Sequence, residues 1–310
     1  MASRTSSMTI ATYFCILLTL NLATSSPVRK LSSLYLPPPV SMTYHKGPLL
    51  GGRLPISILW YGGFTPAQKA IVSDFILSLS AHSGSASVSK QPTVNKWWNM
   101  VQIYLRKAGK ALTSVQMSYQ SVDDKYSLGK MLTRAQIQQL GDGVASKPGG
   151  LTVVLTSQDV AVEGFCMRCG FHSTSKRSTL VWVGNSATQC PGQCAWPFHQ
   201  PMYGPQTPPL VAPNGDVGID GMIINIATLL AGAVTNPYGN GYYQGDAGAG
   251  LEAGSACPGI FGKGAYPGYP GDLLLDTATG ASYNAVGVNG RKFLVPALFD
   301  PSTSQCTTTV

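Results

Sequence analysis

The chain is 310 residues long, has a formal net charge of +8, and contains few charged residues, at 11% of the total. Its length is sufficient for a large buried core, and its 44% hydrophobic content is ordinary for a globular protein. The basic residues are dispersed along the sequence, which argues against a nucleic-acid-binding protein. We therefore expect a globular chain rich in ordered Gly- and Pro-containing loops, with no nucleic acid among its partners.

Residues 1–26 have the features of a secretory signal peptide. Arg4 provides a positive start, an apolar run covers residues 10–23, and small residues suited to cleavage follow it. The run is too short for a stable membrane span, although an uncleaved anchor is the alternative, and the later apolar run 222–234 is shorter still. We expect no membrane span after cleavage, an extended arm at residues 27–44 and a folded domain at residues 45–310. Loss of Arg4 takes the formal charge from +8 to +7, which suits retention in an acidic matrix.

The first part of the domain predicts a strand, two helices and a second strand. Residues 54–61 alternate like a strand, and Thr65-Pro66 is a favourable N-cap and first position for a helix with apolar residues up to Leu79. A polar loop at 82–92 precedes a helix over 93–109, whose apolar side includes Trp97 and Trp98. Residues 116–122 have strand character.

The later part adds further strands and one long buried helix. Thr133 is predicted to begin a short helix that Gly141 ends, and strands are predicted at 151–156 and 179–183, with 160–162 extending the first or pairing with it. The apolar run 222–234 predicts a helix capped by Asp216 or Asp220 and ended by Asn236-Pro237. Residues 283–286 and 293–295 predict a terminal hairpin. Together these elements predict an α+β fold, a single domain with one mixed sheet flanked by helices and a loop-rich C-terminal half linked by disulfides.

Six cysteines remain once Cys15 is removed with the signal peptide, and in a secreted chain they predict three disulfides without fixing their connectivity. They are Cys166, Cys169, Cys190, Cys194, Cys257 and Cys306. The alternative is a zinc site built from the closely spaced pairs at 166/169 and 190/194, because paired thiolates suit tetrahedral coordination. Its candidate ligands are Cys166, Cys169, His172 and His199. The oxidising compartment favours disulfides, so we expect neither a metal nor another cofactor.

Catalytic motifs are missing from the sequence. It contains no His-Glu pair, no GxSxG and no P-loop, and Glu163 and Glu252 are its only glutamates. His172 with Asp216, Asp220 and Glu252 could in principle form a hydrolytic site, but nothing in the sequence shows that these residues meet. Enough aspartates are present for a glycosidase with two facing carboxylates. We predict no catalytic residues and leave a hydrolase, metal-dependent or carboxylate-based, as the alternative.

Aromatic residues crowd the Gly- and Pro-rich segment 182–271. Flat rings with amide and hydroxyl neighbours suit stacking on sugar rings, whereas the alternative is that they fill gaps between loops. His199 has the further alternative of a ring hydrogen-bonded within a rigid loop. The ligand-binding candidates are Trp196, His199, Tyr203, Tyr242, Tyr243 and Tyr266.

Several long motifs carry a family resemblance. They are WVGNSATQCPGQCAWPFHQPMYGP (182–205), NGDVGIDGMI (214–223), TNPYGNGYYQG (235–245), ACPGIFGKGAYPGYPG (256–271) and NGRKFLVPALFDP (289–301). The chain resembles the plant EXORDIUM family, also called phosphate-induced protein 1, from about residue 44 to its C-terminus. The resemblance implies a protein of the apoplast or cell wall linked to growth and cell expansion, and implies no chemical reaction. We expect it to bind a cell-wall polysaccharide or an extracellular protein without catalysis, in an oligomeric state that the sequence does not indicate.

One shorter similarity bears on the fold. Residues 229–237, LLAGAVTNP, are similar to the segment HELAEAVTDP in the active-site helix of some bacterial zincin-like proteins. Thr228 and Leu229 then occupy the positions of the His-Glu pair, and Gly232 that of the second acidic ligand. The similarity implies a degenerate zincin-like fold without metal ligands, and the alternative is a chance match in a buried Ala/Leu helix.

Overall fold

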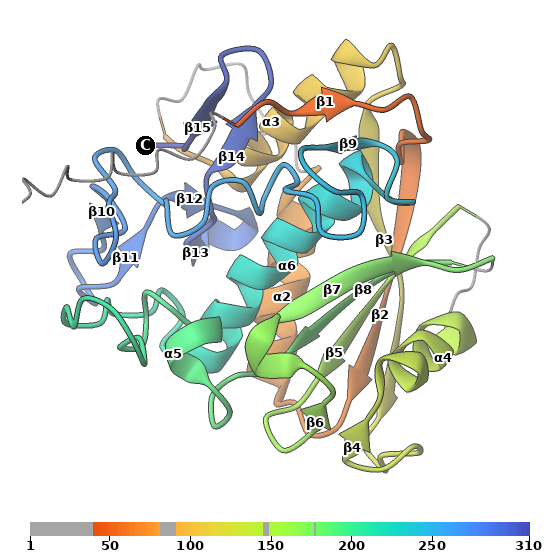
Figure 1. Ribbon diagram of the computed structural model, residues 1–310. Helices are drawn as coiled ribbons and strands as arrows, with labels where there is room; N and C mark the ends of the chain where they lie inside the picture. The colour runs from red at the N-terminus through yellow and green to blue at the C-terminus, as the bar shows by residue number, and fades with distance from the viewer. Residues whose placement is uncertain (1–39, 81–90, 145–148, 177) are drawn as a thin grey trace, which may run out of the picture. The chain divides into compact units, whose positions relative to one another are not determined.

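A five-stranded sheet organises the computed structural model, which describes residues 40–80, 91–144, 149–176 and 178–310 (Figure 1). The strand order is β3-β2-β5-β8-β7, and only β7 at the edge runs antiparallel to its neighbour. The strands are β2 (Gly52–Tyr61), β3 (Thr113–Asp123), β5 (Leu151–Thr156), β7 (Gly170–Thr174) and β8 (Thr179–Gly184). The predicted α+β fold with a mixed sheet is confirmed.

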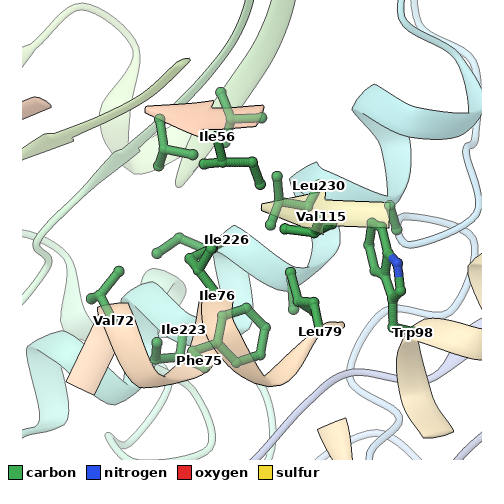
Figure 2. Close-up of a cluster of buried hydrophobic side chains, with 14 of the residues drawn as sticks. Ile56, Val72, Phe75, Ile76, Leu79, Trp98, Val115, Ile223, Ile226 and Leu230 are labelled. Atoms are coloured by element: carbon green, nitrogen blue, oxygen red, sulfur yellow. The ribbon is translucent and has the colours of Figure 1, made fainter. Parts of the chain in front are cut away.

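Helices cover both faces of this sheet because its central strands are apolar on both faces. Helices α2 (Pro66–Ser78), α3 (Val94–Lys107) and α6 (Val217–Thr235) share one buried cluster with the strands, shown in Figure 2. Ile56 and Val115 from the sheet meet Phe75 of α2, Trp98 of α3 and Ile226 of α6 there. On the opposite face, α4 (Arg134–Val144) packs on the alternate residues of the same strands.

Local sequence signals explain where the first helices begin. The Thr65 side chain accepts a hydrogen bond from the Gln68 N–H at 3.2 Å, and the Gln68 side chain accepts one from the Thr65 N–H at 3.0 Å. Pro66 occupies the first turn, where a missing N–H is not needed. Thr93 caps α3 in the same way, through the Lys96 N–H at 3.1 Å. Both predicted helix starts are confirmed.

The long helix α6 is the core helix that the apolar run predicts. Asp216, rather than Asp220, is its N-cap and accepts from the Ile219 N–H at 3.0 Å, while Asn236 follows its last residue. At 19 residues it exceeds the predicted run, and by length and composition it would suffice to cross a membrane. However, 78% of its apolar window is buried inside the protein, as expected for a core helix.

Two local predictions are wrong. Gly141 does not end a helix but lies inside α4, where an added Cβ would lie 2.6 Å from a methyl carbon of Leu180. A small residue is needed there because the helix approaches the sheet closely. Residues 161–162 form β6 (Ala161–Val162), which pairs in parallel with β4 (Met131–Leu132) instead of with β5.

Apart from α6, the described C-terminal half contains short strand pairs, three short helical segments and the disulfides. The predicted terminal hairpin forms from β12 (Ala285–Val286) and β13 (Lys292–Phe293), and Asn289 and Gly290 in its loop have positive φ angles of 58° and 70°. Three disulfides are present: Cys166–Cys190, Cys169–Cys194 and Cys257–Cys306. The predicted use of all six cysteines in disulfides is confirmed. The remaining elements are β1 (Thr43–Tyr44), the 3₁₀ helix η1 (Phe165–Met167), α5 (Pro191–Cys194), β9 (Tyr242–Tyr243), β10 (Leu274–Leu275), β11 (Ser282–Tyr283), η2 (Val288–Gly290), β14 (Leu298–Asp300) and β15 (Gln305–Thr307).

The start of the domain is part of the fold. β1, formed by the last two residues of the predicted arm, pairs antiparallel with β9, and Tyr44 stacks on Tyr242 with ring centroids 4.7 Å apart. Residues 40–310 form one compact unit. The predicted signal peptide and most of the predicted arm lie in residues 1–39, outside the described residues, as does most of the polar loop predicted at 82–92.

Candidate functional site

Three of the predicted ligand-binding aromatics line one hollow of about 530 Å³, which we call the aromatic groove. Trp196, Tyr203 and Tyr266 are its aromatic members, and prolines and glycines form most of the rest. Tyr203 is 80% exposed and Tyr266 is 65% exposed, so their rings are open to a ligand. Trp196 is half-buried because its ring packs on Phe261, with centroids 5.8 Å apart. A partly anchored indole beside two exposed phenols is an arrangement suited to a flat, weakly polar ligand such as a sugar ring.

Covalent links and close packing hold the loops of this groove. Cys194 ends α5 just before Trp196 and is bonded to Cys169, while Cys257 lies just before the groove residue Pro258 and is bonded to Cys306. Gly268 has a φ of 89° and lies so close to Pro205 that an added Cβ would come within 2.5 Å of the ring. Both walls of the groove are therefore fixed in the folded chain.

The other predicted candidates lie elsewhere. Tyr242 is buried in β9, where it packs on Tyr44 and Tyr104, and Tyr243 stacks on His45 with centroids 3.8 Å apart. His199 is exposed, and its Nδ1 lies 2.9 Å from the Gln200 carbonyl oxygen. None of the three lines the aromatic groove.

A second hollow, of about 460 Å³, runs along the edge strand of the sheet, and we call it the β7 groove. All five residues of β7 line it. Its other walls come from the end of α6 and the following turn, from the Gly-rich segment 247–250, and from two arginines, Arg134 and Arg168. The groove thus follows the free side of the strand over its whole length.

A histidine and a glutamate meet in the β7 groove. His172 Nε2 lies 2.8 Å from Glu252 Oε2, and the side chains are 13% and 18% exposed. The second carboxylate oxygen accepts a hydrogen bond from Asn236 Nδ2 at 2.7 Å. Gly232 of α6 makes room for the pair, because an added Cβ there would lie 2.3 Å from Glu252 Oε2. Among the described residues, nothing bonds to the buried Nδ1 of His172.

The geometry separates the residues that the sequence suggested for hydrolysis or for zinc. Glu252 meets His172, but Asp220 in the first turn of α6 and the N-cap Asp216 are roughly 18 Å and 24 Å along the helix axis from Gly232, at 1.5 Å per residue. Cys166 and Cys169 are in disulfides, and within the described ranges no group of three or more His, Cys, Asp or Glu residues is placed to hold a metal. Thr228 and Gly232 align with metal-ligand positions of the zincin-like segment. The Thr228 hydroxyl donates to the Ile224 carbonyl oxygen, and Gly232 has no side-chain atom that could bind a metal.

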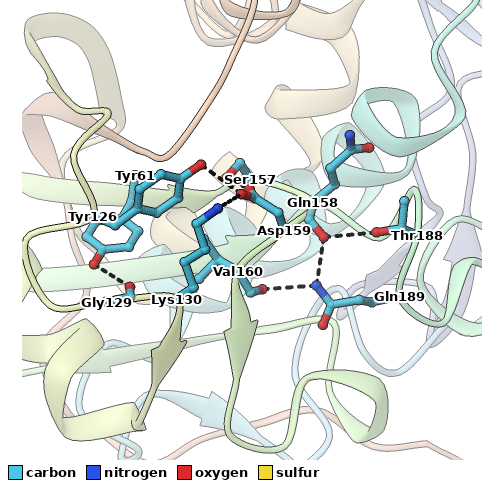
Figure 3. A network of polar contacts seen from close by, with 10 residues as sticks. All are labelled: Tyr61, Tyr126, Gly129, Lys130, Ser157, Gln158, Asp159, Val160, Thr188 and Gln189. Carbon is cyan, nitrogen blue, oxygen red and sulfur yellow. Dashed lines mark hydrogen bonds and ion pairs between the residues drawn. The ribbon is translucent and has the colours of Figure 1, made fainter.

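A third cluster of polar groups lies at the carboxyl ends of β2 and β5, shown in Figure 3. Asp159 accepts hydrogen bonds from Lys130, Ser157 and Tyr126, the last at 2.8 Å. These donors, Lys130 first, hold the pKa of Asp159 well below its usual range. Tyr61 donates to the Gly129 carbonyl oxygen at 2.7 Å. Because each of these groups is paired within the protein, the cluster fixes the turns at this end of the sheet.

Sequence reasoning missed the β7 groove. The strand is short, it begins with Gly170, and residues 170–174 alternate poorly, so its pattern is weak. His172 and Glu252 are 80 residues apart, and no local spacing signal connects them. The one available signal was that the chain contains only two glutamates and four histidines.

The chain matches known proteins over nearly the whole described region. The family model for the phosphate-induced protein 1 conserved region matches residues 42–309. Protein PHOSPHATE-INDUCED 1 of Nicotiana tabacum is 56% identical over 91% of this chain and 93% of its own length. Protein EXORDIUM of Arabidopsis thaliana is 55% identical over 87% of this chain and 89% of its own length, and protein EXORDIUM-like 3 of the same plant is 40% identical over 86% and 83%.

No solved structure matches the chain, so nothing supports the zincin-like relation suggested by residues 229–237. The family model and the relatives cover the segments whose motifs carry the resemblance to EXORDIUM proteins. The chain belongs to the phosphate-induced protein 1 (EXORDIUM) family.

Proposed function

We propose that this protein is a secreted protein of the apoplast that regulates plant growth and cell expansion by binding a cell-wall polysaccharide in the aromatic groove, without catalysis. The observation that carries the proposal is the gathering of Trp196, Tyr203 and Tyr266 around one hollow of about 530 Å³. Exposed aromatic rings bind sugars through apolar C–H contacts, and a groove with fixed walls loses little conformational entropy on binding.

The disulfides and the charge support the location. Three disulfides persist in an oxidising compartment, and the net positive charge favours retention among acidic wall polymers. A fluorescent fusion at the C-terminus should leave the cell, and the same fusion without residues 1–26 should stay inside. Retention of the full-length fusion in the cell would contradict secretion.

The lining of the two grooves favours binding over glycoside hydrolysis. A glycosidase of the usual kind needs two carboxyl groups that face each other across the substrate. Among the described lining residues, the aromatic groove has no carboxylate and the β7 groove has Glu252 alone, which is paired with His172. Robust turnover of a wall polysaccharide by the purified protein would contradict the proposal.

Binding is tested with soluble xyloglucan, mixed-linkage glucan and oligogalacturonide fragments by isothermal titration calorimetry. The double variant Tyr203→Ala with Tyr266→Ala should weaken binding of the preferred glycan at least tenfold, and Tyr266→Phe should retain it because the ring face remains. Tyr119→Ala is the matched control, because Tyr119 is 53% exposed on β3 and does not line the groove. Equal affinity of the double variant and the control would place any glycan site elsewhere.

A further inference from the structure

The free edge of β7 is set by its register with β8. The Ser175 N–H donates to the Ser178 carbonyl oxygen at 2.9 Å, and the Gly184 N–H approaches the Cys169 carbonyl oxygen at 3.5 Å. In an antiparallel pair, residues that bond across the ladder alternate with residues whose N–H and C=O groups point away from it. Residues 169, 171, 173 and 175 therefore face β8, and Gly170, His172 and Thr174 direct their backbone groups outward.

These outward-pointing backbone groups have no hydrogen-bond partner within the described part of the chain. No described residue bonds to the backbone N–H or C=O of Gly170, His172 or Thr174. The three residues line the β7 groove, so the hollow lies where a further strand would add to the sheet. The five residues of β7 span about 17 Å at 3.4 Å per residue, which suits an extended segment of similar length.

The charges at one end of the groove favour an acidic ligand. Arg134 and Arg168 both line the groove, and no carboxylate in the described ranges lies within salt-bridge distance of either guanidinium. The Arg134 guanidinium lies over the Phe171 ring, 4.5 Å from its centroid, which holds it beside the strand. Glu163 accepts a hydrogen bond from the backbone N–H of Arg134 at 3.3 Å, and it makes no ion pair with the guanidinium of Arg134 or Arg168.

The two faces of the strand present different surroundings. His172, paired with Glu252, lies on the face that packs against α6, whereas Phe171 and Arg134 lie on the opposite face with α4. Successive side chains of an added strand point to opposite faces, so one side chain would meet the arginines and its neighbours would meet the His172–Glu252 pair. The Gly-rich segment 247–250 has little side-chain bulk to block entry.

We propose that the β7 groove binds an extended peptide segment of another extracellular protein by strand addition, with an Asp or Glu side chain of that segment paired to Arg134 and Arg168. Unpaired edge groups supply the main-chain hydrogen bonds, and the alternate side chains supply specificity. A peptide fits better than a polysaccharide here, because its regularly spaced N–H and C=O groups match those of Gly170, His172 and Thr174. The site is separate from the aromatic groove and does not rest on the proposed glycan function.

The probes are blocked octapeptides of alternating Thr and Val, with Glu, Gln or Lys placed at each position in turn. We expect the best Glu peptide to bind the mature, oxidised protein at least tenfold more tightly than the matching Gln and Lys peptides. The same Glu peptide, N-methylated at every second amide so that the N–H groups facing β7 are lost, keeps all of its side chains. It should no longer bind. Equal affinity of the methylated and unmethylated peptides would overturn strand addition.

Two further measurements locate the site. Binding should slow hydrogen exchange at the amides of Gly170, His172 and Thr174, and Arg134→Gln with Arg168→Gln should remove the preference for Glu over Gln. Lys176→Gln is the control, because Lys176 is an exposed cation just after β7 that does not line the groove. Absence of peptide binding, or binding of oligogalacturonide with the same dependence on the arginines, would overturn the proposal. The variant with Tyr203→Ala and Tyr266→Ala should keep peptide binding, which distinguishes a failure here from a failure of the glycan proposal.

Discussion

Because of Asp220, the folded chain should lose stability as the pH rises from about 4 to about 7. Its carboxylate is buried near the start of α6 and accepts hydrogen bonds from the Asn214 N–H at 2.9 Å and from Asn214 Nδ2 at 2.6 Å. Burial is the main cause that raises its pKa from 3.8 to about 7, and the Asn214 bonds oppose this rise without cancelling it. Asp216, the N-cap carboxylate of the same helix, adds a smaller effect in the raising direction.

The size and the sign of the change in stability follow from the difference between the pKa of Asp220 in the folded chain and its ordinary value. Between about pH 4 and pH 7 the unfolded chain releases the proton and the folded chain keeps it, so the free energy of unfolding falls as pH rises. At 1.36 kcal/mol per pH unit, the full loss is on the order of 4 kcal/mol, reached near pH 7 and constant above it. Asp159 and Asp276 have lowered pKa values, so their contribution to stability is lost only below about pH 4.

The test is urea denaturation of the oxidised protein at pH 4, 5, 6, 7 and 8. Asp220→Asn cannot ionise, so the difference between wild type and variant should change by on the order of 4 kcal/mol across this range, even if the variant is less stable overall. The difference between the curves cancels the histidines, which are common to both proteins. Asp246→Asn is the control, because Asp246 is exposed and leaves Asp220 intact. Parallel curves for wild type and Asp220→Asn would refute the reasoning.

Three further variants test the scaffold by the same denaturation assay at one pH. Thr65→Ala removes the capping hydrogen bond of α2 and should cost about 1 kcal/mol. Phe75→Ala empties a fully buried position between α2 and its neighbours and should cost roughly 3–5 kcal/mol, through lost burial and a cavity. Replacing Cys257 and Cys306 together with Ser removes a link between residues 49 apart in sequence and should cost about 4 kcal/mol, mainly by releasing the unfolded chain.

Matched control variants distinguish the loss of a helix cap or of core packing from the general effect of shortening a side chain. Thr277→Ala removes an exposed hydroxyl that caps no helix, and it should stay within about 0.5 kcal/mol of wild type. Leu77→Ala shortens a side chain on α2 that is 47% exposed, so it should cost well under the Phe75 variant. If Thr65→Ala lowered the free energy of unfolding no more than Thr277→Ala does, the role of Thr65 as a helix cap would be contradicted. If Phe75→Ala lowered it no more than Leu77→Ala does, the role of Phe75 in the core would be contradicted. For the disulfide, an unchanged free energy of unfolding in the double Ser variant would contradict the loop-closure argument.

The helices were predictable because their signals are local. Thr65-Pro66, Thr93 and Asn236-Pro237 each place a cap or a stop within a few residues of the helix end that it determines. Gly141 shows where such reasoning fails. A glycine in a helical sequence predicts the end of the helix, and only the close packing of Gly141 against Leu180 of the sheet explains why it lies inside one. Its role depends on a packing distance, which sequence spacing does not contain.

The candidate sites were predictable only where their residues lie in one loop region. The crowding of aromatics in residues 182–271 indicated a binding surface, and the structure brings Trp196 and Tyr203 together with Tyr266 from a later loop. It also separates Tyr242 and Tyr243, whose rings serve the packing of β1. The His172–Glu252 pair depends on the long chain path between an edge strand and a loop that follows α6. Composition indicated that these two residues were rare, but only the fold shows that they meet.

The disulfides connect the two grooves more closely than their separate linings suggest. Cys169 directly precedes β7 and is bonded to Cys194, which ends α5 and lies two residues before Trp196. Cys166 and Cys190 form a second link between the same two segments. Arg168 lies between Cys166 and Cys169, so one end of the β7 groove and one wall of the aromatic groove are fixed by the same pair of covalent links. A short rigid unit that holds both walls explains why these four cysteines are closely spaced in two pairs, a pattern that zinc coordination would also have suited.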